Sequence, residues 1–416
     1  MTKLATSLAD VLPAEALVPS AGDGTGPAAR RPPEAEVHPE TTAEVAATLG
    51  WAAAQGVGVL PMASGARLRS AALDRPYVLL RTDRLRGIEL YEPADLTLTA
   101  RAGTPLAELA ERLGAHRQWL PFDPPHVGER SLGGLVATGE SGPVWMGYGE
   151  LRNHVLGVTV VTGDGRTLRL GGRVVKNVAG FDLLKPMVGS RGRLAVITSV
   201  CVRAFPVPAE DRLLVLRADS AADLVDAARA VGTAPVLPVS CVILSPARAL
   251  GAGSALLVRL HGSLPTVDAD QRTLERHCGV TFERPADAAR VHAEARDAAS
   301  RGPVGLVVST LPSRLAGALA AVAESLGGAP GSVELVADTY LGRVRVAADA
   351  IELERVGTLW TAVEGMGGSL SVRSPAGGGV TVGNESLHPR SRGVAELVAG
   401  LERVFDPSSV LWPCRS

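Results

Sequence analysis

The sequence has few aromatic residues and no excess of charge of one sign, and these two shortages exclude several kinds of nucleic-acid-binding protein. Phe, Trp and Tyr make up 3% of the 416 residues, so little surface is available for stacking bases. The 42 Lys and Arg residues are balanced by 43 Asp and Glu residues. No general positive field is therefore available to hold a phosphate backbone or an anionic lipid surface.

Cysteine is also scarce. Cys201, Cys241, Cys278 and Cys414 are widely scattered and form no CxxC pair, which argues against a disulfide framework, a zinc ribbon or an iron-sulfur cluster held by this chain. This pattern favours a reducing cytoplasm. The eight histidines contain no HxH or HExxH pair, so we predict no metal site.

Two kinds of targeting segment are missing as well. Asp10 and Glu15 interrupt the first apolar stretch, so we expect no signal peptide. No uninterrupted run of about 18 apolar residues follows, and we expect no transmembrane segment.

Three standard catalytic signatures are absent from the sequence. It contains no GxGxxG, no glycine-lysine pair of a Walker loop and no GxSxG. A nicotinamide Rossmann enzyme, a P-loop NTPase and an ordinary α/β hydrolase are therefore disfavoured.

The length and the breaker residues predict the domain organisation. A chain of 416 residues suggests two or three domains. Ser20 to Pro33 is rich in Gly, Ala and Pro, so residues 1–36 are expected to be an extension and linker, with the folded unit starting near Val37. The pattern changes after Pro206, which predicts domains at 37–206 and 207–400 and a tail at 401–416.

Local patterns in the first half indicate an α+β fold. Thr41 and Glu44 form a capping box ahead of a helix that Gly56 ends, and Val57 to Leu60 follows as a strand. Asp164-Gly165 separates two β-rich runs and predicts a hairpin.

The second half shows one order of elements twice. A βαββαα block at 213–300 is followed by a related block at 304–373, which predicts an antiparallel sheet covered by helices on one face. Val394 to Phe405 is expected to be a helix that Asp406-Pro407 ends.

Three segments dense in small residues remain, at 61–70, 131–143 and 176–198, and we expect each to be a loop. Backbone N–H groups beside Gly and Ala can converge on phosphate oxygens, and missing side chains let the backbone approach a flat ring. The alternative interpretation is three ordinary surface turns.

The order and content of these segments resemble the FAD-binding oxidoreductases of the vanillyl-alcohol oxidase (PCMH) type. More narrowly, the chain resembles the FAD-binding E subunits of glycolate oxidase. The resemblance rests on Leu120-Pro121-Phe122-Asp123-Pro124-Pro125-His126, Leu132-Gly133-Gly134 with Ala137-Thr138-Gly139, Tyr148-Gly149, Lys176-Asn177-Val178-Ala179-Gly180-Phe181-Asp182 and Val404-Phe405-Asp406-Pro407. It covers about 37–206 and the last fifteen or so residues.

The resemblance implies a two-part PCMH-type FAD-binding domain, a ferredoxin-like α+β second domain and a tail that returns to the first. Residues 62–70 would wrap the pyrophosphate, 131–134 and 139–142 would line the cofactor, and 189–197 would hold its adenine end. The implied FAD-binding residues are Pro61, Met62, Ala63, Ser64, Gly65, Ala66, Arg67, Pro125, Ser131, Leu132, Gly133, Gly134, Ala137, Thr138, Gly139, Ser141, Gly142, Lys176, Gly180, Asp182, Gly189, Gly192, Ala195, Val196 and Ile197.

The chain departs from the family pattern in its first loop. Gly65 is the one glycine among residues 62–66, where the family usually has several, which predicts weaker binding of the pyrophosphate. No His or Cys lies in this loop, so FAD is expected to be non-covalent. Ala195, Arg191, Trp412 and Cys414 also replace residues usual in the family.

Oxidation of a hydroxy acid needs a cation for the carboxylate and a base for the hydroxyl proton. The sequence offers His126, Arg130 and Arg373 as candidate catalytic residues. His126 could instead hydrogen-bond loop backbone, Arg373 could lie at the surface, and Lys176 could form a structural ion pair. His388 lacks the partner histidine of metal-dependent relatives and is expected in a turn.

The resemblance predicts an FAD-dependent subunit of a glycolate oxidase complex, which oxidises a 2-hydroxy acid to a 2-oxo acid. Its partners would be a larger FAD-binding subunit and an iron-sulfur subunit, and any attachment to the inner face of the cell membrane would come through them. One alternative is a free-standing dehydrogenase for a hydroxy acid or an alcohol. Another is a non-catalytic assembly subunit whose flavin site has decayed.

Overall fold

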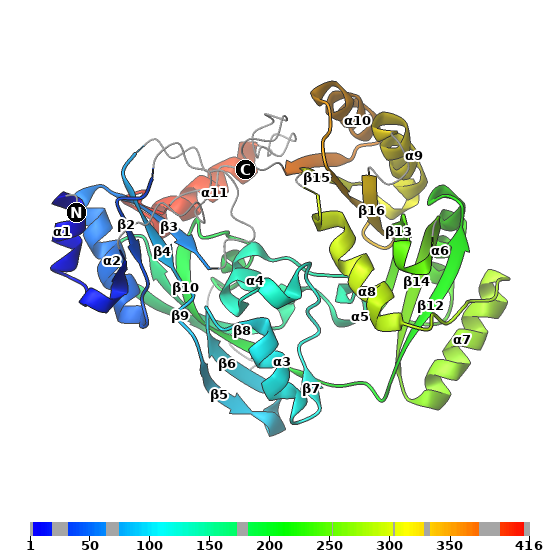
Figure 1. Cartoon of the computed structure of the whole chain (residues 1–416), viewed down its shortest axis with the longest axis horizontal. Helices are drawn as coiled ribbons and strands as arrows, with labels where there is room; N and C mark the ends of the chain where they lie inside the picture. Colours follow the sequence, from blue (N-terminus) through cyan, green and yellow to red (C-terminus); the bar gives the residue numbers. More distant parts are fainter. Residues whose placement is uncertain are drawn as a thin grey trace.

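Helices and strands alternate through both halves of the chain, which confirms the α+β prediction (Figure 1). The structure is a computed structural model, and it describes residues 3–18, 32–63, 75–172, 182–251, 253–302, 304–327, 333–373 and 392–411.

A four-stranded sheet lies at the N-terminal end of the fold, in the order β1-β2-β4-β3. Its central strand β4 runs parallel to both β2 and β3. Helix α2 (Thr42–Gln55) precedes β3, as predicted: the Thr41 hydroxyl accepts the Glu44 N–H at 3.2 Å, and Gly56 ends the helix with φ 67°. The strands are β1 (Leu17–Val18), β2 (Ala35–Val37), β3 (Gly58–Met62) and β4 (Tyr77–Arg81).

The N-terminal segment differs from the expected extension. Helix α1 (Lys3–Ala9) and the residues after it bury Leu8, Leu12 and Ala16 in the same core as α2. Strand β1 pairs with β2. The expectation that folding starts near Val37 is wrong for residues 3–18, because their apolar side chains find a partner surface that local sequence patterns do not reveal.

A five-stranded sheet follows, with the order β5-β6-β10-β8-β9 and antiparallel pairing throughout. The predicted hairpin is β8–β9, and Gly165 in its turn has φ 81°. Helices α3 (Leu106–Gly114) and α4 (Leu132–Thr138) pack into the core of this sheet. The strands are β5 (Ile88–Glu92), β6 (Thr97–Arg101), β8 (Val155–Thr162), β9 (Thr167–Gly171) and β10 (Ala195–Arg203), and β7 (Gln118–Trp119) pairs separately with β11 (Phe205–Pro206).

The second half forms a seven-stranded antiparallel sheet in the order β12-β14-β13-β16-β17-β15-β18. The two predicted blocks meet where β13 pairs with β16. The strands are β12 (Glu210–Ala218), β13 (Ser240–Ser245), β14 (Ser254–Gly262), β15 (Val304–Ser309), β16 (Val333–Asp338), β17 (Arg343–Ala348) and β18 (Ser369–Arg373).

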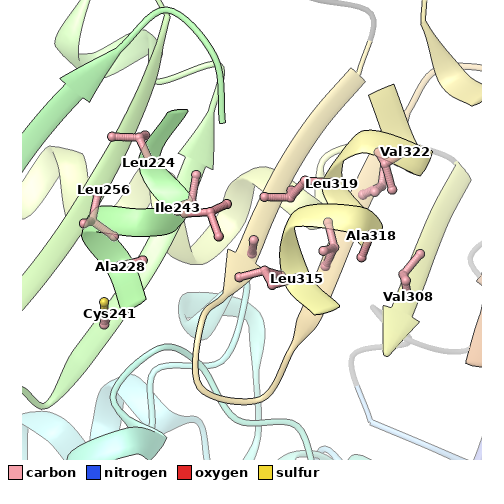
Figure 2. Close-up of a cluster of buried hydrophobic side chains, with 14 of the residues drawn as sticks. Leu224, Ala228, Cys241, Ile243, Leu256, Val308, Leu315, Ala318, Leu319 and Val322 are labelled. Carbon is pink, nitrogen blue, oxygen red and sulfur yellow. The ribbon is translucent and has the colours of Figure 1, made fainter. Parts of the chain in front are cut away.

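Helices cover both faces of this sheet, which corrects the expectation of one covered face. Residues of α6, α7, α9 and α10 share a core with Ile243 and Leu256, and Figure 2 shows Leu315 and Leu319 of α9 in it. The opposite face is covered by α8. The helices are α6 (Val225–Thr233), α7 (Leu264–Cys278), α8 (Ala288–Asp297), α9 (Leu315–Leu326) and α10 (Leu353–Gly365).

The C-terminal segment returns to the first sheets, as the resemblance implied (Figure 1). Helix α11 (Arg392–Phe405) ends at Asp406, whose carboxylate accepts the N–H groups of Val410 and Leu411 at 2.9 and 2.8 Å. Leu411 forms a parallel bridge with Val59 of β3. The last turn therefore closes the core of the four-stranded sheet.

Candidate cofactor site

The structure brings together parts of all three segments that are rich in small residues. Pro61 lies at the end of β3, and a Cβ on Gly192 would come within 3.6 Å of it. A Cβ on Gly139 would lie 3.0 Å from the Cα of Gly189. Pro61, Gly139, Gly189 and Gly192 therefore gather from three separate stretches of the chain.

The second segment is a short helix and not a loop as expected. Ser131 begins α4 by accepting the Gly134 N–H at 3.2 Å, and Gly139 ends it with φ 64°. Leu132 is fully buried, and a Cβ on Gly133 would lie 2.5 Å from the Cβ of Ala102. Leu132 is thus a core residue with no surface for a cofactor, and Gly133 lets α4 pack against the residue that follows β6.

The third segment is fixed to the end of α4 by two backbone hydrogen bonds. The Gly189 N–H donates to the Val136 carbonyl at 2.9 Å and the Arg191 N–H donates to the Ala137 carbonyl at 2.8 Å. Gly139 and Gly189 are exposed, and both have positive φ. Their exposed backbone, without side chains, fits the approach of a flat ring or a phosphate chain.

Three further predicted contacts in this segment belong to the core. Strand β10 begins with Ala195, Val196 and Ile197, which are between 1% and 6% exposed to solvent. Their side chains pack in the cores of the two sheets. Their side chains therefore offer no surface to a cofactor, and the prediction that residues 189–197 hold the adenine end stays a prediction about the backbone of this stretch.

Close packing also explains Gly142. A Cβ there would lie 1.7 Å from the Asp123 carbonyl oxygen, and the Asp123 carboxylate accepts the Val144 N–H at 3.3 Å. Pro125 is buried in the same Asp-Pro-Pro turn. The turn and the segment after α4 therefore hold each other in place.

Several predicted residues lie outside the described part of the chain, namely Ser64, Gly65, Ala66, Arg67, Lys176 and Gly180. Met62 is buried, and its carbonyl accepts the Thr82 N–H at 2.8 Å. Asp182 is exposed and pairs with Lys185 at 3.3 Å. Thr138 and Ser141 lie at and beyond the end of α4.

His126 contacts the second half of the chain. Its N–H donates to the Asp297 carboxylate at 2.9 Å, and its Nε2 lies 3.0 Å from the Ser300 hydroxyl. Burial raises the pKa of Asp297, but hydrogen bonds from Arg296 and from the His126 N–H outweigh it and lower that pKa. These contacts give His126 a docking role.

Arg130 is buried and ion-paired within its own half. Its guanidinium donates to Glu140 at 2.7 Å and to the Thr138 hydroxyl at 2.7 Å. These hydrogen bonds give the guanidinium partners within the protein and hold the turn after α4 in place. Arg373 ends β18, where its backbone pairs with Gly305.

A chain of polar contacts that the sequence analysis missed joins the two halves. Asp123 lies 3.2 Å from His292 Nε2, and Arg259 donates to the same nitrogen at 2.9 Å. Arg259 also donates to Asp211. No local motif marks Arg259 or Asp211, because they meet through strand pairing.

The same chain of contacts continues to Tyr148. His261 lies 3.1 Å from Asp211, and its Nδ1 lies 2.8 Å from the Tyr148 hydroxyl. Burial raises the pKa of Asp211, but hydrogen bonds from Arg259 and His261 outweigh it and hold that pKa well below its usual range. Burial raises the pKa of Tyr148.

Nearby, helix α5 (Trp145–Tyr148) docks on the seven-stranded sheet. The Trp145 indole N–H donates to Asp338, and the Gly147 N–H donates to the Val239 carbonyl at 3.2 Å. A Cβ on Gly147 would lie 2.6 Å from the Cα of Val239. This glycine therefore permits the close approach of the two halves.

Within the described ranges, no group of three or more His, Cys, Asp or Glu side chains could hold a metal ion. No helix among the described residues is long and apolar enough to cross a membrane.

Comparison with curated proteins gives partial matches. The chain is 48% identical over 124 residues to glycolate oxidase subunit GlcE of Escherichia coli (strain K12), a match that covers 30% of this chain and 35% of that one. It is 35% identical over 173 residues to D-lactate dehydrogenase of Archaeoglobus fulgidus, covering 41% and 38%. The matches thus span little more than a third of the length of these relatives.

Comparison with solved structures supports the fold of the whole chain. The structure of p-cresol methylhydroxylase with substrate bound is similar with a TM-score of 0.76 and 15% identity, covering 99% of this chain and 96% of that one. Residues 33–171 match the family described as FAD binding domain, and the cofactor is therefore FAD.

Proposed function

We propose that this chain takes part in the FAD-dependent oxidation of a 2-hydroxy acid to a 2-oxo acid. The observation that carries the proposal is its similarity to a glycolate oxidase subunit and to a D-lactate dehydrogenase. Both names refer to oxidation of a hydroxyl group next to a carboxylate. When bound, FAD would supply the hydride acceptor for oxidation at the α-carbon.

The protein's own part in this proposal is to hold and orient the reactants. The backbone at exposed Gly139 and Gly189 and at half-buried Gly192 would hold FAD against the first half of the chain. The contacts through His126 and Tyr148 would fix the seven-stranded sheet beside it. Fixed geometry of this kind lowers the entropic cost of bringing a substrate to a cofactor.

The same proposal includes the organisation of the protein. The FAD domain would span 37–206, a substrate domain 207–400 and the tail 401–416. FAD would be non-covalent, since no His or Cys lies at 61–70. A larger flavin subunit and an iron-sulfur subunit would complete a glycolate-oxidising complex. The cluster would belong to another subunit because none of the four cysteines of this chain forms a CxxC pair.

The glycine-poor first loop favours a second candidate function. With Gly65 as the one glycine among 62–66, the pyrophosphate has fewer unhindered N–H groups to bind. A non-catalytic assembly subunit with a decayed flavin site would show this feature. Flavin retention separates it from both enzyme proposals, and co-purification with two other chains separates a complex subunit from a free-standing dehydrogenase.

The visible spectrum of the purified chain, before and after acid precipitation, tests these proposals. We expect a flavin spectrum that moves to the supernatant, followed by anaerobic bleaching of the intact protein with glycolate or D-lactate. Colour that stays in the pellet would contradict non-covalent binding. A colourless, folded chain that also fails to take up added FAD would refute the enzyme proposals.

A further inference from the structure

Arg345 lies on β17, on the face of the seven-stranded sheet that contacts the first half of the chain. It pairs with Val336 of β16 and with Val307 of β15. Directly opposed residues of an antiparallel pair share one face of the sheet. Val336 packs on the α8 face, which is also the face of Arg259 and Asp338 by the strand register. Arg345 therefore faces the same way as the docking residues.

The strand register places Arg345 on the same sheet face as Asp338, which accepts the indole N–H of Trp145, a residue that follows the predicted cofactor segment. Burial and the positive charge of Arg343 lower the pKa of the Arg345 guanidinium, while Asp338, Asp123 and Glu140 act in the opposite direction. Glu140 belongs to the segment 139–142 that follows α4. The guanidinium is therefore partly desolvated on the sheet face that meets the first half of the chain, where Glu140 contributes to its electrostatic environment.

Each of these three acids is engaged by other donors. Asp338 accepts from Trp145 and from the N–H groups of Tyr340 and Leu341. Asp123 accepts the Val144 N–H at 3.3 Å, and Glu140 pairs with Arg130 at 2.7 Å.

Arg345 itself has no hydrogen bond and no ion pair within 4.0 Å among the described residues. Its side chain keeps partial access to solvent. A guanidinium presents five N–H donors in a planar fork, and a desolvated one without a partner costs free energy unless it meets an anion. A carboxylate is the planar anion that this fork binds through two parallel hydrogen bonds.

We propose that Arg345 binds the carboxylate of the substrate at the junction between the seven-stranded sheet and the turn after α4. This inference rests on the proposed function. It assigns the carboxylate contact to Arg345 because Arg130 already pairs with Glu140 and the His126 N–H already donates to Asp297. The residue binds and positions the substrate, and it transfers no proton.

The test measures binding, not turnover. Full-length FAD-loaded wild type, Arg345→Met and Arg345→Lys are titrated with oxalate in a calorimeter, because oxalate carries the carboxylate but no oxidisable hydroxyl group. We expect Arg345→Met to weaken oxalate binding about 10- to 100-fold, the loss expected when a charge-assisted pair of hydrogen bonds is removed. Arg345→Lys retains the positive charge but not the planar fork of N–H donors, so its affinity for oxalate should lie between those of wild type and Arg345→Met.

Arg343→Met is the matched control, since Arg343 is an exposed arginine two residues earlier on the same strand and the same face. It should bind oxalate within about twofold of wild type, because an exposed charge contributes little. Equal oxalate affinity of Arg345→Met and wild type would overturn the proposal, whether or not the melting temperature falls.

The outcomes also separate this inference from the proposed function. If wild type binds no oxalate and no 2-hydroxy acid bleaches its flavin, both the proposed function and the inference about Arg345 are refuted. If wild type is bleached by glycolate and Arg345→Met is bleached with an unchanged KM, the assignment of Arg345 fails and the proposed function stands.

Discussion

At some positions in this fold, a closely packed neighbour determines which residue can be accommodated. Gly142 belongs to a motif that the resemblance assigns to the cofactor, yet its immediate constraint is the Asp123 carbonyl, which lies where a Cβ would be. Gly133 likewise permits contact with Ala102. The sequence pointed to both glycines through a family motif, but the atoms that exclude a side chain are far away along the chain.

Gly142→Ala should therefore destabilise the protein by about 1–3 kcal/mol, the usual cost of forcing an extra methyl group into a packed site. It should also reduce flavin retention, because the turn after α4 would have to move. Chemical denaturation and the flavin-to-protein absorbance ratio measure the two effects. Gly128→Ala, where a Cβ meets nothing within 4 Å, should change stability by less than about 0.5 kcal/mol; similar losses in both variants would contradict this explanation.

At the scale of elements, the sequence predicted most helices and strands but not their partners. The capping box of α2 and the hairpin β8–β9 were predicted because their signals lie within a few residues of each other. The segment 131–143 was expected to be a loop, since its glycines disfavour a helix, and packing of Leu132 and Leu135 in the core makes part of it helical. The contacts from Asp123 to Tyr148 depend on strand register in β12 and β14 and had no local signal.

Asp211→Asn should weaken these contacts in a pH-dependent way. The pKa of Asp211 is depressed in the folded protein, so its carboxylate contributes stability above the unfolded pKa of about 3.9, and that contribution is lost as the pH falls through the lower folded value. At pH 7 the variant should be less stable by about 1 kcal/mol, because Asp211 is partly exposed. The difference should shrink below about pH 4.

Thermal melts at pH 7 and pH 3 measure this difference. Asp226→Asn removes an ion-paired but highly exposed carboxylate, which contacts Arg229, and should have little effect at either pH. A deficit of Asp211→Asn that is as large at pH 3 as at pH 7 would show that its carboxylate charge is not the cause.

At the scale of the whole molecule, the ends of the chain complete the first core. Helix α1 and the turn at Asp406 pack against the four-stranded sheet from opposite ends of the sequence. Val410 and Leu411 are buried there. The tail was predicted from its resemblance to a family signature, and the N-terminal contribution was not, because the breaker-rich stretch Ser20 to Pro33 resembled a linker.

Asp406→Ala should destabilise the protein by about 2 kcal/mol, because the buried N–H groups of Val410 and Leu411 would lose their acceptor. The effect should appear in chemical denaturation and as faster amide exchange in β3, which Leu411 bridges. Ser408→Ala, at an exposed position two residues away, is the control. Unchanged exchange in β3 would show that the tail does not stabilise this sheet.

Local sequence patterns were sufficient to predict the α+β class and most element positions, and the sequence motifs were sufficient to predict the FAD cofactor. These features depend on residue spacing, capping and turn chemistry within short stretches, and on a fingerprint of small residues. The tertiary structure was needed to show that Arg130 pairs with Glu140, that His126 contacts Asp297, and that Arg345 shares a sheet face with Asp338 and has no hydrogen-bond partner among the described residues. Such facts depend on which strand pairs with which and on the contact between two halves of the chain, and neither is encoded in any local pattern.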